Sequence, residues 1–359
     1  MRTMTRTREE RQANAAKKVE AALEVLQTQV AALRSGEDWQ RYLEFSAKLH
    51  AYSPRNVMLI AAQHAQAYME GKVSSPAPSY VAGYRTWQAL GRQVDKGQKG
   101  YVVLAPVRYK RHEAVAADGA IRQLAKSEQL RPGETEHFRQ VLAGFTVEHV
   151  FAAEQTFGAE LPPPPTAQLL AGEAPAGLGA AVLELIEARG YEVDTAAGAG
   201  ELGGANGVTI WDSKRVRIRC DMDDAAMVKT LIHEAAHVML HATAPGSLIS
   251  RHQKEVEAES VAFVVAAAHG MRSDGYSFPY VTGWAGSDPA KAISGAQSRI
   301  SHAAVAILDV SPAVHGDGGR VPGAQAALEA ARAARAVEVE RTAGPALSEP
   351  GEVGLGVAS

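Results

Sequence analysis

The chain has 359 residues, of which 46% are hydrophobic and 21% charged, and its formal net charge is −3 at pH 7. This length suggests about two domains with sizeable cores, and the small net charge by itself favours no class of partner. The single cysteine, Cys220, excludes an intramolecular disulfide and a zinc site of the Cys₄ or Cys₂His₂ type. Because no apolar stretch can span a bilayer and the basic N-terminus lacks the apolar core of a signal peptide, we expect a cytoplasmic protein without a membrane partner.

The first part of the chain is predicted to be largely helical. Apolar residues recur at helical spacing, Ser35-Gly36 separates the first helix from the second, and Ser53-Pro54 caps the third. A run rich in β-branched residues between glycine turns indicates a buried strand. The expected elements are helices over 8–34, 37–49 and 55–70, a turn or short helix over 81–91, and strands over 101–108 and 145–151. The polar residues 114–137 between those strands are expected to form an excursion on the surface.

Positive charge is concentrated between residues 51 and 112. Nine Lys and Arg residues stand there against two Asp and Glu residues, a difference of 9 − 2 = +7. The aromatic residues interleaved with these cations include Tyr80, Tyr84, Trp87 and Tyr101. Cations that follow phosphates and aromatic faces that stack on bases suit single-stranded nucleic acid. The alternative is a solvated basic turn with Trp87 in the core. The predicted DNA-binding residues are Tyr84, Arg85, Trp87, Arg92, Lys96 and Lys99.

A proline run, Leu161–Pro165, marks the clearest domain boundary in the chain. Beyond it, a helix over 179–189, a strand that begins at 191, and a hairpin of 208–211 with 215–219 are expected. Another helix is expected over 288–308. The hairpin precedes the helix described next, so its edge strand can hold an extended peptide by adding it to the sheet.

The sequence His233-Glu234-Ala-Ala-His237 lies in a segment with strong helix signals, including acidic residues at its start. Residues four apart share one face of a helix, so His233 and His237 can bind one metal ion. Glu234 lies beside them, where it can reach a metal-bound water. This is the zinc-hydrolase arrangement, in which two histidines bind Zn²⁺ and a glutamate is the general base. The alternative is an amphipathic helix whose polar face is merely solvated.

A third ligand is expected from the next apolar segment, which carries Glu255, Glu257 and Glu259. Glu255 and Glu259 are four apart and share a face, whereas Glu257 points elsewhere. Burying these carboxylates is costly unless they are paired or bind a metal. We take Glu255 as the third ligand and Glu259 as the acceptor that orients a histidine, and the reverse assignment stays open. We expect about one Zn²⁺ per chain. The ion would lower the pKa of a bound water to about 7. Glu234 would take a proton from that water and return it to the leaving amine.

These motifs, with Leu-His just after the first, resemble the zincin domains of the ImmA/IrrE family and of ArdC-type antirestriction proteins, over about 210–308. The resemblance implies a metallopeptidase-like fold with Zn²⁺ bound by two histidines and one glutamate. Tyr280 and Trp284 also resemble that group. Tyr280 can help to stabilise an oxyanion, and the alternative role of both is an aromatic anchor under a loop.

The N-terminal motifs resemble the same ArdC type. They include Trp39-x-x-Tyr-Leu and Gly83-Tyr-x-x-Trp87, followed by Lys96-Gly-x-Lys-Gly100, within about 37–157. The resemblance implies a domain that binds single-stranded DNA, and a setting of mobile-element defence against restriction. The insertion over 114–137 departs from the pattern.

The sequence therefore predicts an α+β protein, with a mixed α/β domain that binds single-stranded DNA, followed by a zincin-like domain of small sheet, active-site helix and glutamate helix. Its partners would be single-stranded DNA and a protein or peptide substrate of unknown identity. Two alternative functions stay open: a non-catalytic protein that coats single strands and has a structural zinc module, and an ImmA/IrrE-like protease that cleaves a repressor. The expected divisions are an N-terminal helix over 1–36, the DNA-binding domain over 37–160, a linker over 161–178, the metallopeptidase domain over 179–310, and a tail over 311–359. The tail is expected to be largely disordered apart from a solvated helix over 324–341.

Overall fold

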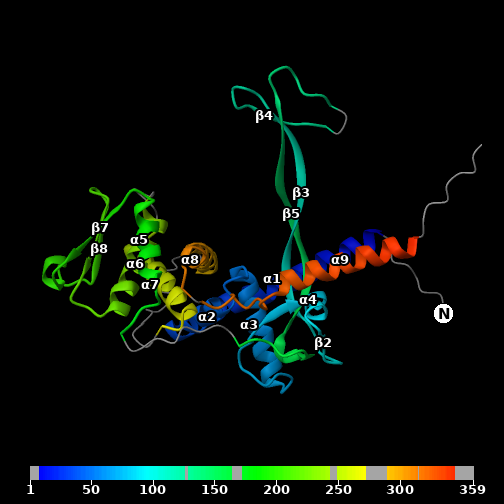
Figure 1. Ribbon diagram of the computed structural model, residues 1–359, viewed down its shortest axis with the longest axis horizontal. Coiled ribbons are helices and arrows are strands. Elements are labelled where there is room, and N and C mark those ends of the chain that lie inside the picture. The colour runs from blue at the N-terminus through cyan, green and yellow to red at the C-terminus, as the bar shows by residue number, and fades with distance from the viewer. Residues whose placement is uncertain are drawn as a thin grey trace, which may run out of the picture.

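The computed structural model describes residues 8–125, 128–163, 172–242, 249–271, 289–313 and 315–343. The fold is of mixed α+β type, as expected. Figure 1 shows a helical body, a small sheet with its helices at one end, and a long two-stranded arm that projects away from the body. None of the helices in the described ranges is long and apolar enough to cross a membrane.

The N-terminal helices form where the sequence predicts them. Ser35 caps α2 by accepting from the backbone of Asp38, whose side chain bonds back to the Ser35 backbone, and Ser53 caps α3 with proline in the first turn. Trp39, Leu43 and Ile60 are fully buried between these helices and their neighbours. The bounds are α1 Arg8–Ala32, α2 Gly36–Lys48 and α3 Pro54–Met69.

The larger sheet has the strand order β1-β5-β3-β4. Its strands are β1 Val81–Gly83, β3 Tyr101–Val115, β4 Ile121–Gln123 and β5 Thr135–Ala152, and a short helix α4, Tyr84–Ala89, follows β1. The free edge of β3 near the body is covered by α3. Asn56 bonds to both backbone groups of Leu104, and Gln63 does the same at Val102, so this edge is closed to other strands.

The strands of the arm are longer than the sequence predicts. β3 and β5 stay paired from Tyr101↔Val150 to Val115↔Thr135, with one bulge after Val107. The expected surface excursion over 114–137 is therefore only the tip of the arm. No helix of the described ranges covers the outer half, and its residues lack the alternation of apolar and polar residues that marks a half-buried strand. A further pair of short strands, β2 Arg92–Val94 and β6 Thr156–Gly158, lies at the base of α4.

The small sheet has the order β7-β9-β8, with β8 and β9 forming the expected antiparallel hairpin and β7 parallel to β9. Helices α5 and α6 pack on it, and α7 and α8 follow behind α6 (Figure 1). The bounds are α5 Leu178–Glu187, β7 Glu192–Ala196, β8 Gly207–Ile210, β9 Arg215–Arg219, α6 Asp224–His241, α7 Arg251–Ala268 and α8 Pro289–Val310. This arrangement leaves β8 at the edge of its sheet, beside α6.

The segment after α8 is more ordered than its composition suggests. Gly318 and Gly319 accept backbone hydrogen bonds from Ala51 and Val81, and Val321 is buried beside Trp87. Gly319 has φ +80°, and a Cβ there would lie 2.4 Å from a methyl group of Leu49, so a glycine is required for this close approach. Helix α9, Ala324–Ala343, then packs on α4. The helix expected over 324–341 is therefore present, and the segment before it is ordered by contacts with the N-terminal part of the chain.

Candidate metal centre

Helix α6 presents the two histidines as the sequence predicts. Asp223 caps the helix by accepting from the backbone of Ala226 at 2.8 Å, and Ile232 and Ala235 face the core with no exposed surface. With that face buried, the face that carries His233 and His237 lies toward α7. Their Nε2 atoms are 3.1 Å apart.

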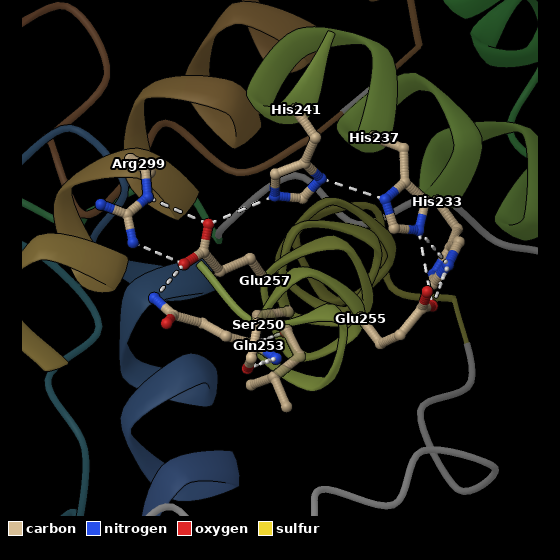
Figure 2. Close-up of polar contacts among 10 residues, drawn as sticks. His233, His237, His241, Ser250, Gln253, Glu255, Glu257 and Arg299 are labelled. Carbon is tan, nitrogen blue, oxygen red and sulfur yellow. Dashed lines mark hydrogen bonds and ion pairs between the residues drawn. The ribbon is translucent and has the colours of Figure 1, made fainter. Parts of the chain in front are cut away.

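Glu255 approaches the same point from the first turns of α7. Its Oε2 atom lies 3.5 Å from Nε2 of His233 and 3.5 Å from Nε2 of His237 (Figure 2). The three ligand atoms all lie within 4.8 Å of one another, the one such group found among the described residues. A tetrahedral ion with bonds of 2.0–2.2 Å separates its ligand atoms by roughly 3.4 Å. The three side chains therefore fit around one ion of that size.

Glu259, the alternative third ligand, lies on the other side of the His233 ring. Its Oε2 atom is 3.1 Å from Nδ1 of His233, and its Oε1 atom is 3.7 Å from Nζ of Lys229. One turn of α7 thus separates a carboxylate that meets both Nε2 atoms from one that meets a single Nδ1 atom. The Nδ1 contact is the one that orients a metal-binding imidazole.

The ionisable groups of this cluster perturb one another strongly. Burial disfavours protonation of His233, but the hydrogen bonds with Glu255 and Glu259 outweigh it and raise the pKa of His233 to about 9. Hydrogen bonds from His233 and His237 hold the pKa of Glu255 far below its usual range. The cluster therefore carries a proton at neutral pH when no metal is bound.

Glu234 points from α6 toward β8. Thr209 Oγ1 donates a hydrogen bond of 2.6 Å to Glu234 Oε2, and the side chain is almost fully buried. Gly207 lies so close that a Cβ there would be 2.9 Å from Glu234 Oε1. An open cleft of about 1010 Å³ lies in front of this group and is lined by both histidines, Glu255 and the edge strand β8. The proposed base, the three donor atoms and a free strand edge thus line one cavity.

A buried polar network behind His237 was not predicted from the sequence. His237 Nδ1 lies 3.0 Å from Nδ1 of His241, and His241 Nε2 lies 3.4 Å from Oε2 of Glu257. Glu257 also accepts from Arg299 of α8 and from Gln253 (Figure 2). The i, i+4 spacing of His237 and His241 was visible in the sequence, but the partners on α7 and α8 depend on tertiary packing.

Two of the predicted DNA-binding residues, Trp87 and Arg92, make contacts within the protein. Trp87 has no exposed surface, and its Nε1 donates to the Phe151 carbonyl at 3.1 Å. Arg92 donates through Nε and Nη2 to Thr156. The Trp87 ring cannot stack on a base in this conformation, because none of its surface is exposed. The structure thus places Trp87 in the core, as in the alternative interpretation, and ties the guanidinium of Arg92 to the backbone and side chain of Thr156.

The other four predicted DNA-binding residues are exposed: Tyr84, Arg85, Lys96 and Lys99. The structure adds cations that the prediction omitted. Arg108 and Lys110 lie on one face of the arm, and no carboxylate pairs with them in the described ranges. Tyr280, the candidate oxyanion residue, lies outside the described residues.

Comparison with known proteins agrees with the N-terminal motifs. Residues 10–147 match the family model of the N-terminal domain of anti-restriction factor ArdC. An uncharacterized protein of Bacillus anthracis is 26% identical over 266 residues, which cover 70% of this chain and 43% of the relative. The chain therefore spans less than half the length of that relative.

Two solved structures of the antirestriction protein ArdC from plasmid R388 are also similar. The metal-free structure shares 18% identity over 72% of this chain and 84% of its own, with a TM-score of 0.41. The Mn(II)-bound structure shares 19% identity over 76% of this chain and 98% of its own, with a TM-score of 0.40. The family match therefore identifies an ArdC-type N-terminal domain over residues 10–147 of this chain.

Proposed function

We propose that this protein is a divalent-metal-dependent peptide hydrolase. The observation that carries the proposal is the triangle of His233 Nε2, His237 Nε2 and Glu255 Oε2, which lies beside Glu234 in a cleft with a free strand edge. A structural metal site is closed by four protein ligands, whereas a catalytic site leaves one position open to water or substrate. The three donors here face an open cavity.

The donor set suits zinc best, because two imidazoles and one carboxylate are common ligands of catalytic zinc. Manganese is the alternative, since carboxylates suit that ion too. When bound, the ion would polarise the peptide carbonyl and lower the pKa of water. His233, His237 and Glu255 would hold it, and Glu259 would keep the His233 ring in place through Nδ1.

Glu234 is the proposed general base. The Thr209 hydroxyl fixes its Oε2 atom, so the orientation of the carboxylate is set by β8. Glu234 would accept a proton from the attacking water and return it to the leaving amine. The edge of β8 would hold the substrate in extended form through backbone hydrogen bonds. The substrate would thus be aligned by the same strand that orients the base.

The test is Glu234→Gln in the full chain, assayed on unfolded casein with zinc or manganese. We expect hydrolysis by the wild type, loss of hydrolysis in the variant, and unchanged metal content. Glu192→Gln, on an exposed side chain of β7, is the matched control for loss of one carboxylate. Hydrolysis that persists in Glu234→Gln would overturn the proposal. Metal binding without hydrolysis of any peptide would favour the non-catalytic alternative.

A second proposed function is binding of single-stranded nucleic acid by the arm and its base. Arg108, Lys110, Leu142 and Phe145 share one face of the ribbon by register, and Arg55 of α3 lies over the Phe145 ring. Exposed rings between unpaired cations are typical of surfaces that stack bases and follow phosphates. The exposed members of the predicted DNA-binding set, which belong to the same basic segment, are Tyr84, Arg85, Lys96 and Lys99.

Together these activities would bring a peptidase to proteins on single-stranded DNA, in the mobile-element and antirestriction setting suggested by the family. If the basic surface recognised a repressor instead, affinity for oligothymidylate would be negligible, and cleavage of one protein partner would be insensitive to salt. A steep salt dependence of oligothymidylate binding would favour the nucleic-acid function.

A further inference from the structure

His237 is connected to the interior of the protein by a chain of buried polar groups. The chain runs from His237 Nδ1 to His241 Nδ1 at 3.0 Å, and from His241 Nε2 to Glu257 Oε2 at 3.4 Å. The His241 side chain is 1% exposed, and Glu257 is 0% exposed. Arg299 bonds to both carboxylate oxygens of Glu257, at 3.0 and 2.5 Å. A buried carboxylate is retained at such a position only when it is fully partnered.

The partners of Glu257 determine where the protons of the two histidines lie. The guanidinium of Arg299 donates to both oxygens of Glu257, and Gln253 donates to Oε1, so this buried carboxylate is held in its ionised form. An ionised carboxylate can only accept, so Nε2 of His241 carries a proton. With Nε2 of His241 turned to Glu257, the Nδ1 atom of His241 is left to accept a hydrogen bond from Nδ1 of His237. This leaves the lone pair of His237 Nε2 facing His233 and Glu255.

We propose that His241 and Glu257 are positioning residues that fix the tautomer and ring orientation of His237 for metal binding. The inference rests on the proposed function in so far as His237 is a metal ligand. The two histidines would then be oriented differently: His233 directly by the partly exposed Glu259, and His237 through His241 by a carboxylate tied to Arg299. Helix α8 thereby becomes part of the metal centre, although none of its described residues lines the cleft.

The test measures zinc affinity of the full chain by competition with a chromophoric chelator. His241→Phe keeps the ring volume but removes the acceptor, and we expect about 10–100-fold weaker binding, as for other groups that orient a metal-binding histidine. His241→Asn places an oxygen near the position of Nδ1 and should restore most of the affinity. His252→Phe, on an exposed histidine of α7, is the matched control and should change nothing.

A purely structural role of His241 would give a different result. His241→Phe and His241→Asn would then weaken zinc binding equally, in parallel with any loss of thermal stability, and the inference would be overturned. Wild-type affinity in His241→Phe would overturn it too. If His241→Phe does not fold, Glu257→Gln provides the second variant, because it keeps the shape of the side chain but leaves a weaker, neutral acceptor. Its zinc affinity should fall, and an unchanged value would count against the relay.

Failure of the proposed metal-dependent function can be distinguished from failure of the positioning role of His241 and Glu257. If the wild type binds no divalent metal, ¹⁵N chemical shifts of the His237 ring in the metal-free protein still report its tautomer. We expect a proton on Nδ1 in the wild type and a mixture of tautomers in His241→Phe. A mixture in the wild type would overturn the relay whether or not the protein binds a metal.

Discussion

Trp39 Nε1 donates a 2.9 Å hydrogen bond to Ser260 Oγ, 221 residues further along the chain, and both side chains are fully buried. Trp39 belongs to α2, within the segment that matches the ArdC N-terminal domain, and Ser260 follows Glu259 on α7. One continuous cluster of buried apolar residues extends from α2 and α3 to α6, α7 and α8. The helix that carries Glu255 is therefore supported by the N-terminal helices.

Trp39→Phe should destabilise both ends of the molecule together. The change removes one buried hydrogen bond, about 1 kcal/mol, and leaves a cavity where the larger ring was, so we expect a loss of roughly 2–3 kcal/mol. Denaturant unfolding followed by circular dichroism would measure it, with Trp211→Phe, on a half-exposed ring, as control. An unchanged midpoint would show that this contact contributes little.

Glu255→Ala should weaken zinc binding more than Glu259→Ala. The first change removes an atom that lies 3.5 Å from both Nε2 atoms, whereas the second removes only the acceptor at Nδ1 of His233. We expect about 10–100-fold weaker binding for Glu259→Ala and a larger loss for Glu255→Ala. Chelator competition on both variants and on Glu192→Ala provides the comparison. A larger loss of zinc affinity for Glu259→Ala would make Glu259 the metal ligand and Glu255 the residue that orients a histidine.

Zinc affinity should rise with pH in the neutral range. Metal binding needs a neutral His233, whose pKa in the metal-free protein is raised to about 9, so a proton competes with the ion below that pH. We expect about a tenfold gain in apparent affinity per pH unit from 7 toward 9, and then a plateau. Competition titrations in zinc-buffered solutions would show it. In Glu255→Ala the plateau should begin at lower pH, because a partner that favours protonation is missing; an identical profile in both proteins would contradict this origin of the effect.

Gly207→Ala should disturb the base more than the metal. A Cβ at this position would lie 2.7 Å from Cγ2 of Thr230 and 2.9 Å from Oε1 of Glu234, so β8 and α6 must move apart or Glu234 must turn. We expect a loss of about 1–3 kcal/mol of stability, loss of hydrolysis and retained zinc. Gly200→Ala is the matched control, since no atom lies within 4 Å of a Cβ there. Full activity in Gly207→Ala would show that Glu234 does not depend on this contact.

Arg108→Gln with Lys110→Gln should weaken binding of oligothymidylate. If both cations contact phosphates, the slope of log affinity against log salt should become shallower by about 1.4. Fluorescence anisotropy at several salt concentrations would measure this. Lys17→Gln with Lys18→Gln, on the exposed surface of α1, changes the net charge by the same amount. Equal effects of the two double variants would mean that only the overall charge matters, and the arm would lose its proposed role.

The arm and the aromatic residues show where sequence reasoning failed. Trp87 was open to two readings, since an indole beside cations can stack on a base or fill a core, and only packing against Phe151 and Val321 decided between them. The length of β3 was underestimated, because strands with both faces in solvent lack the alternation by which strands are recognised.

The features that depend on local geometry could be predicted from the amino-acid pattern alone. A helix of 3.6 residues per turn places His233 and His237 on one face in any fold. Ser35, Ser53 and Asp223 begin their helices by accepting hydrogen bonds from residues three positions further along. Tertiary structure decided the rest. Which carboxylate meets both histidines depends on the rotation of α7 against α6, and the link from His241 through Glu257 to Arg299 depends on a third helix. Such contacts join side chains far apart in the chain, so their geometry follows from the packing of the whole core and not from any local pattern.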